Sequence, residues 1–267
     1  RCKEYDAIEN IIDFKQGDIF LGLDLAQHVV ISKRDYYKEL QAYGVKTYFV
    51  VYDLLPVLSS EYFPQEWELE KVHTSWLNAV SQSNGAICIS MSVKNELQNW
   101  IKNNHINTKK SFTIEKFHLG VEVDNRMAST GSFLNSKAII NKISSKVTFL
   151  IVGTIEPRKS HKEVLDTFEE LWKENIDVNL VIVGKEGWLV KKLIERLENH
   201  SELNKRLFWL VSVSDEYLGN IYNASACLIA ASKSEGFGLP LIEAAQHGLP
   251  IIARDIPVFR EVAGEHA

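Results

Sequence analysis

The residues best suited to chemistry are two glutamates, Glu235 and Glu243, at the ends of the segment Glu-Gly-Phe-Gly-Leu-Pro-Leu-Ile-Glu. Pro240 suits the first turn of a helix, because an N–H group there has no intrahelical partner. Such a helix would aim its positive end and the N–H groups of the preceding loop at a phosphate. The loop residues concerned are Phe237, Gly238 and Leu239. Because carboxylates repel phosphate but hold hydroxyl groups, we expect a diphosphate between two sugars, with Glu243 in the first turn of the helix.

Three further charged residues follow apolar runs that are predicted to be strands. Arg158 and Lys159 come after Gly153, and a lysine at the end of a strand suits the stabilisation of a leaving phosphate. In the first half of the chain, Asp53 follows the apolar run 47–52 and is the best candidate there for a residue in a cleft. The alternative interpretation is that Asp53 only caps the loop at the strand end.

Short apolar runs alternate with amphipathic stretches, the pattern of β-α-β units around a mostly parallel sheet. The segment 127–146 is rich in Ser, Asn, Thr and Gly, which predicts a linker. The fold class is therefore α/β, with two Rossmann-like domains, over 1–126 and 147–267, and a cleft between them. Strands are predicted at 18–24, 47–52, 85–89, 112–119, 147–152, 179–183, 207–210, 226–230 and from 251, and helices include 33–43, 66–81, 162–174, 188–200, 215–223 and 240–247. Ligands bind beyond the carboxyl ends of such strands.

The composition excludes several classes of protein. The 267 residues carry 30 basic and 35 acidic side chains, and the resulting net charge of −5 argues against nucleic acid as the main partner. The three cysteines are widely spaced, which argues against a disulfide scaffold and favours a cytoplasmic location. No Asp-x-Asp motif is present, and no metal site is predicted. No apolar run is long enough to span a bilayer. The lack of a Gly-x-Gly-x-x-Gly or P-loop motif argues against dehydrogenases and P-loop nucleotidases.

The pattern around the two glutamates resembles the retaining glycosyltransferases of family four, which have the GT-B fold. The resemblance covers most of the chain and is more specific in its second half. The similar stretches are Val152–Lys159, Val211–Leu218 and Tyr222–Ile229 in that half, and Val51–Pro56 and His118–Val121 in the first. The first-half stretches resemble bacterial mannosyltransferases that build O-antigen or other surface polysaccharides. The resemblance implies that 1–126 is a partial, acceptor-side domain and 147–267 a partial, nucleotide-sugar-binding domain. Since relatives have further strands at both ends, the chain looks like a central portion of a longer enzyme.

The resemblance implies a set of catalytic residues. Lys159 would bind the donor diphosphate, and Arg158 would partly replace an arginine that many relatives carry where this chain has Thr154. Glu235 would hold a hydroxyl group of the donor sugar. Asp53 would face the cleft from the first domain, although family members often carry His-Asp where this chain has Tyr-Asp.

The resemblance also implies a donor-binding set. Glu243 would hold the ribose, the backbone near Val213 would hold the base, and Gly184 would let the nucleotide approach closely. Gly153 completes this set together with the three loop residues before the helix at Pro240. No metal ion and no cofactor are implied, because the nucleotide-sugar is itself the donor substrate.

The resulting hypothesis is a metal-independent, retaining hexosyltransferase. It would move mannose from GDP-mannose to a glycan or lipid-linked glycan in surface polysaccharide synthesis. Its place would be the cytoplasm, with peripheral association with the inner membrane face or a synthase complex left open. Two alternatives remain: a nucleotide-sugar epimerase of the same architecture, and a non-catalytic donor-binding domain of a larger synthase.

Overall fold

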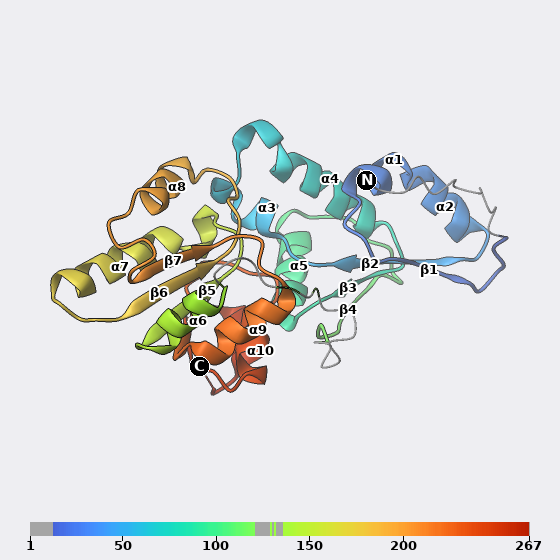
Figure 1. Ribbon diagram of the computed structural model, residues 1–267. Helices are drawn as coiled ribbons and strands as arrows, with labels where there is room; N and C mark the ends of the chain where they lie inside the picture. The colour runs from blue at the N-terminus through green and yellow to red at the C-terminus, as the bar shows by residue number, and fades with distance from the viewer. Residues whose placement is uncertain (1–12, 121–128, 130, 132–135, 267) are drawn as a thin grey trace.

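The computed structural model describes residues 13–120, 129, 131 and 136–266, and it shows two parallel β-sheets (Figure 1). The first sheet has the order β1-β2-β3-β4 and the second β7-β6-β5-β8-β9, with every pairing parallel. The strands are β1 (Ile19–Gly22), β2 (Lys46–Val51), β3 (Gly85–Cys88), β4 (Thr113–Lys116), β5 (Thr148–Val152), β6 (Asn179–Val183), β7 (Leu207–Leu210), β8 (Cys227–Ala230) and β9 (Ile251–Ala253). The predicted α/β class with two parallel sheets is confirmed.

Helices connect these strands, as expected for parallel pairing. They are α1 (Gln27–Ser32), α2 (Arg34–Ala42), α3 (Leu55–Leu58), α4 (Leu69–Ser81), α5 (Met91–Asn103), α6 (Ser136–Ser144), α7 (His161–Lys173), α8 (Lys191–Glu198), α9 (Asp215–Ala224), α10 (Leu239–Gln246) and α11 (Pro257–Ala263). Short 3-10 turns lie at Ser60–Tyr62, Gln65–Trp67 and Pro157–Lys159. Helices α1, α3 and α11 were not predicted from the sequence, and α8 is shorter at both ends than the predicted 188–200.

The second sheet is covered on both faces because successive residues of its central strands are apolar and point in opposite directions. Ile151 and Ile182 pack with residues of α7 and α8 in one core. Leu150 and Val181 pack with residues of α6 and α9 in another. Figure 1 shows α8 and α9 on opposite sides of this sheet.

The first sheet has one core, built from β2 and β3 together with α4 and α5. Ser90 caps α5 by accepting a hydrogen bond from the Val93 N–H at 3.1 Å. The strand predicted at 18–24 lies at an edge: β1 ends the described sheet, and Ile19 is 66% exposed. Its side chains have a neighbouring strand on one side only.

The segment expected to be a linker contains a helix. The structure places α6 at Ser136–Ser144, and the fully buried Ile143 joins the second sheet's core beside α9. The polar composition of the segment conceals isoleucines at 139, 140 and 143, which share one helical face. Residues 121–128, 130 and 132–135 lie outside the described residues, and the domain boundaries at 126 and 147 stay predictions.

The two sheet units touch each other directly. The Ser90 hydroxyl donates to the Gly236 carbonyl oxygen at 3.0 Å, and the carboxylate of Glu261 on α11 accepts from the N–H groups of Met91 and Ser92 at 2.6 and 2.8 Å. This carboxylate therefore lies at the positive end of α5, where a negative charge is favoured. The loop that follows β8 is thus held against the first unit.

Candidate active site

The candidate site lies where the strand order of the second sheet reverses. From β5 the chain moves to β6 and β7 on one side, and β8 and β9 lie on the other. The loops after β5 and β8 therefore leave neighbouring strands at the same sheet edge. In open α/β sheets this reversal point is where ligands bind.

A cluster of paired charges joins these two loops. Lys159 Nζ lies 2.5 Å from Glu235 Oε1, and Arg158 Nη1 lies 2.8 Å from Glu235 Oε2. Arg158 also pairs through Nη2 with Glu156 Oε1 at 2.6 Å, so it bridges two carboxylates. The Ser232 hydroxyl donates to Glu235 Oε1 at 2.8 Å. The structure thus brings together three of the four predicted catalytic residues.

The surroundings shift the two carboxyl groups in opposite directions. Burial favours a higher pKa for Glu235, but the ammonium of Lys159 and the guanidinium of Arg158 outweigh it and hold that pKa below its ordinary value. Burial raises the pKa of Glu156, and Arg158 and Lys159 only partly oppose this. Glu235 is therefore the carboxylate that the cluster keeps ionised.

Two glycines let the backbone form this cluster. Gly153 has φ +139°, and a Cβ there would lie 3.3 Å from Cε and Nζ of Lys159, so the lysine stem lies over the glycine. A Cβ on Gly184 would lie 1.9 Å from the Gly153 carbonyl oxygen, so the ends of β5 and β6 need a glycine there for packing. The predicted role of Gly184 in nucleotide approach is a separate requirement and stays a prediction.

Asp53 reaches the cluster from the first unit. Its Oδ1 accepts from the Leu55 N–H at 3.0 Å, which is the loop cap considered as an alternative. Gly236 allows the contact between units, because a Cβ there would lie 2.4 Å from the Tyr52 carbonyl oxygen and 3.2 Å from Asp53 Cβ. Burial raises the pKa of Asp53, while the Leu55 N–H and Arg158 oppose this. Asp53 therefore has a structural partner and also lies beside the charged loop.

Glu243 lies just past the first turn of its helix, where it was predicted to lie within that turn. Helix α10 begins at Leu239, so Glu243 is its fifth residue, and the first turn contains no acidic residue. Its Oε2 accepts from the hydroxyl of Tyr222 at 2.7 Å, and that tyrosine, on α9, is buried. Glu243 is half-buried. The tyrosine fixes one carboxylate oxygen and leaves the second for another donor.

The loop before α10 combines a buried side chain with free backbone donors. Phe237 is 5% exposed and packs in the core of the first sheet, whereas Leu239 is exposed. No described residue accepts a hydrogen bond from the N–H of Phe237 or Gly238. These donors fit the predicted anion site. Val213 follows β7, which is separated from β5 by β6, and no contact joins it to the charged cluster among the described residues.

Three side chains that hold predicted site residues were not predicted from the sequence. Glu156, Ser232 and Tyr222 each hold a predicted site residue, and the buried carboxylate Glu156 could have been suspected from its position between the strand and Arg158. His118, noted only as part of a similar stretch, pairs with Glu261 at 2.9 Å, and its ring centroid lies 5.9 Å from that of Phe237.

The cavity at the cluster is narrow. It has a volume of about 20 Å³ and is lined by residues that include Lys159, Glu235 and Gly238. Ligand pockets usually measure about 300–1,000 Å³, so this cavity is too small for a ligand of nucleotide size in the structure as it stands. In the part of the chain that is described, no group of three or more His, Cys, Asp or Glu could hold a metal ion. None of the described helices is long and apolar enough to cross a membrane.

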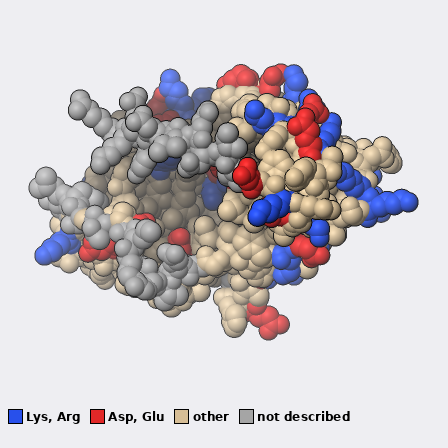
Figure 2. Space-filling model, turned by 90° about the vertical axis from the view of Figure 1, so that its right-hand side faces the viewer, with Lys and Arg blue, Asp and Glu red and all other residues tan. Residues whose placement is uncertain are grey.

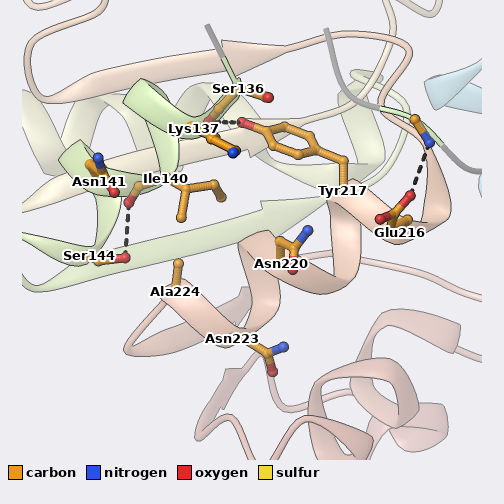
Figure 3. A pocket seen from close by; sticks show the side chains of 11 residues that line it. Ser136, Lys137, Ile140, Asn141, Ser144, Glu216, Tyr217, Asn220, Asn223 and Ala224 are labelled. Atoms are coloured by element: carbon orange, nitrogen blue, oxygen red, sulfur yellow. Dashed lines mark hydrogen bonds between the residues drawn. The ribbon is translucent and has the colours of Figure 1, made fainter.

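Another pocket, of about 600 Å³, lies between α6 and α9 (Figure 3). None of the predicted site residues lines it. Two of its polar groups are engaged: the Tyr217 hydroxyl donates to the Ser136 carbonyl oxygen at 3.1 Å, and Glu216 accepts from the Gly131 N–H at 3.0 Å. In the space-filling view, the described part of the visible face carries basic and acidic side chains intermixed (Figure 2).

The two-sheet fold and its charged reversal point define a class of protein. A family model described as glycosyl transferases group 1 matches residues 133–267. The chain therefore belongs to the group 1 glycosyltransferases, and its architecture is the GT-B fold.

Among individual relatives, the chain is similar to the serotype-specific mannosyltransferase WbdA of Escherichia coli. The two are 42% identical over 270 residues, which cover 99% of this chain and 32% of WbdA. The O-antigen chain mannosyltransferase RfbU of Salmonella typhimurium is 24% identical over 214 residues, covering 79% of this chain and 53% of RfbU. A structure of Anabaena HepE in complex with UDP and glucose matches with a TM-score of 0.61 at 15% identity, over 90% of this chain and 60% of HepE. The chain thus spans about a third of WbdA.

Proposed function

We propose that the chain forms part of a retaining mannosyltransferase. It would transfer mannose from GDP-mannose to a glycan or lipid-linked glycan in O-antigen or related polysaccharide synthesis. The observation that carries the proposal is the cluster of Lys159, Arg158 and Glu235 at the reversal point of the second sheet, beside the free N–H groups that precede α10. The similarity to WbdA and RfbU supports mannose as the sugar.

In this proposal the two cations change partners when the donor binds. The diphosphate would take the place of Glu235 as the anion that contacts Lys159 and Arg158. The freed Glu235 carboxylate would accept a hydrogen bond from a hydroxyl of the donor sugar, and Glu243 would hold the ribose. Backbone N–H groups of Phe237 and Gly238 would add to the phosphate contacts.

The chemistry would be mainly electrostatic. As the glycosidic bond breaks, negative charge grows on the leaving phosphate, and Lys159 is placed to stabilise it. The acceptor hydroxyl would attack from the same face and pass its proton to the leaving phosphate oxygen. Asp53 would position the acceptor from the first unit, since it lies beside the charged loop. With a lipid-linked acceptor, the transfer would take place at the inner face of the cytoplasmic membrane.

Titration with nucleotide-sugars tests the proposal. GDP-mannose should bind and raise the melting temperature of the chain, because a ligand specific for the folded state stabilises it. Glu243→Ala should weaken donor binding on the order of tenfold and leave turnover at saturating donor nearly unchanged, since it holds ribose equally before and during transfer. Glu235→Ala should lower turnover more than affinity. Glu195→Ala, an exposed glutamate on α8, is the matched control.

Three outcomes would contradict the proposal. No stabilisation by GDP-, UDP- or dTDP-sugars would exclude donor binding. Release of an epimerised free sugar without acceptor would identify an epimerase. Donor binding without transfer to any mannosylated acceptor would identify a non-catalytic domain.

A further inference from the structure

A pocket of about 610 Å³ opens on the other side of the Arg158 loop, where the two units meet. Its walls come from α7, α8 and the loops before them, and Tyr62 contributes from the first unit. The residues that matter for its chemistry are Tyr62, Glu156, His161, Glu163, Glu186 and Leu189.

Two buried polar groups of this pocket lack hydrogen-bond partners. Neither Nδ1 nor Nε2 of His161 has one within the described parts of the chain, although the residue is only 1% exposed. The same holds for Oε2 of Glu156, a residue that is 3% exposed. Buried polar atoms are nearly always hydrogen-bonded, so such a pair in one cavity wall requires an explanation.

The buried histidine of the pocket is neutral, and charges of both signs line the rest of it. Burial lowers the pKa of His161 to about 3, and Lys159 adds to the effect, so the imidazole is neutral. A neutral imidazole offers one donor and one acceptor, which together suit a hydroxyl group. Of the lysines in the lining, Lys162 and Lys233 pair with Asp166 and Glu163, each at 2.7 Å, whereas no described residue forms an ion pair with Lys191 or Lys192.

Apolar surface completes the lining. The side chain of Leu189 is exposed, and the ring of Tyr62 lies beneath the Lys233 ammonium, 5.8 Å from its Nζ. Trp188 fixes this rim across the two units, because its Nε1 donates to the Tyr62 carbonyl oxygen at 2.7 Å and its ring stacks on Phe63. Aromatic and aliphatic surface beside hydroxyl-binding groups is what the faces and edges of a pyranose ring require.

We propose that this pocket binds a saccharide unit of the acceptor glycan, with His161 and Glu156 as its buried hydroxyl-binding groups and Tyr62 as part of its apolar wall. The inference rests on the proposed function, since it assumes a glycan acceptor. The pocket adjoins the candidate active site, because Arg158 pairs with Glu156 on this side and with Glu235 on the other. A growing glycan held here would stay close to the charged cluster between transfers.

Calorimetric titration of the chain with α-mannotriose tests the inference. The trisaccharide should bind weakly, and His161→Phe should weaken binding on the order of tenfold, because the new side chain fills the site but leaves ligand hydroxyls unpaired. His161→Gln keeps a donor and an acceptor and should restore part of the affinity. His200→Phe is the matched control, because His200 is also largely buried but already pairs with Glu169 at 2.9 Å. Circular dichroism would verify that each variant is folded.

The outcomes separate this inference from the proposed function. Trisaccharide binding that is unchanged in His161→Phe, or no binding by a chain that still binds GDP-mannose, overturns the inference alone. If inorganic pyrophosphate displaces the trisaccharide, and if His161→Phe weakens pyrophosphate binding, the pocket is an anion site. That result also overturns the inference. Trisaccharide binding that depends on His161 in a chain that binds no nucleotide-sugar supports the inference and refutes the proposed donor site.

Discussion

The two units contribute to their junction in different ways. The loops after β5 and β8 supply full charges, with Lys159 and Arg158 paired to Glu235 in a buried cluster. The first unit contributes groups that its own residues hold: Asp53 caps Leu55, and the buried His73 contacts the Asp53 carbonyl oxygen at 3.1 Å. Burial lowers the pKa of His73 to about 4, so it is neutral. The charge that could stabilise a leaving group therefore comes from one side, and the other side can only position a partner.

The largest expected effect tests the charged side. Lys159→Ala should lower turnover about a hundred- to thousandfold, because it removes a preorganised cation whose contact strengthens as the leaving group departs. Initial rates with GDP-mannose and a mannosylated acceptor would measure it. Lys173→Ala, at the other end of α7, removes an exposed lysine paired with Glu170 and should leave the rate unchanged. Near-normal turnover of Lys159→Ala would contradict the inference that the second unit supplies the charge that stabilises the leaving group.

Arg158→Ala should act first on stability. It leaves the buried carboxylate of Glu156 without its partner, and breaking a buried pair typically costs about 3 kcal/mol of the free energy of unfolding. Adding Glu156→Gln should recover part of that loss, because the unpaired charge disappears. Denaturant unfolding of both variants measures the change in the free energy of unfolding. A stability unchanged by Arg158→Ala would contradict the pairing.

Arg158 is also expected to replace the arginine that relatives carry at the position of Thr154. If it does, Thr154→Arg should partly restore donor binding to Arg158→Ala.

The fold class could be predicted because it depends on local patterns in the sequence. Both β6 and β7 were predicted with the bounds the structure gives, because each is an unbroken apolar run between polar segments. Glu243 lies just past the first turn of α10 rather than in it, because the helix begins one residue earlier than predicted. Contacts between loops distant in the sequence were beyond prediction: nothing near Glu156 shows that Arg158 will bridge it to a carboxylate 79 residues further on.

A smaller effect tests the first unit. Asp53→Asn should keep the cap on Leu55, because the amide oxygen can accept the same hydrogen bond, so stability should change little. Turnover should fall on the order of tenfold if the carboxylate positions the acceptor hydroxyl. Steady-state kinetics with varied acceptor would separate an effect on acceptor KM from one on kcat. A thousandfold loss would show that both units supply essential charge.

The smallest expected effect is on pH dependence. The pKa of Glu235 lies below its ordinary value of 4.5 in the folded chain, so its ionisation stabilises the fold above that pH and this contribution disappears as the pH falls through the folded pKa. The stability advantage of the native chain over Glu235→Gln should therefore shrink on acidification below about pH 4.5. Denaturant unfolding at pH 6 and pH 4 would measure it. An advantage that grows on acidification would mean that burial outweighs Lys159 and Arg158.

Phe237 belongs to the second unit by chain position and to the first by packing. Its ring fills space among side chains of the other sheet, next to the Gly236 backbone that contacts Tyr52. A chimaera that takes its two halves from different relatives would therefore pair this ring with a socket that evolved for another side chain. Exchange of halves should succeed only between relatives that agree at both positions, so this junction limits how freely the two halves can be recombined.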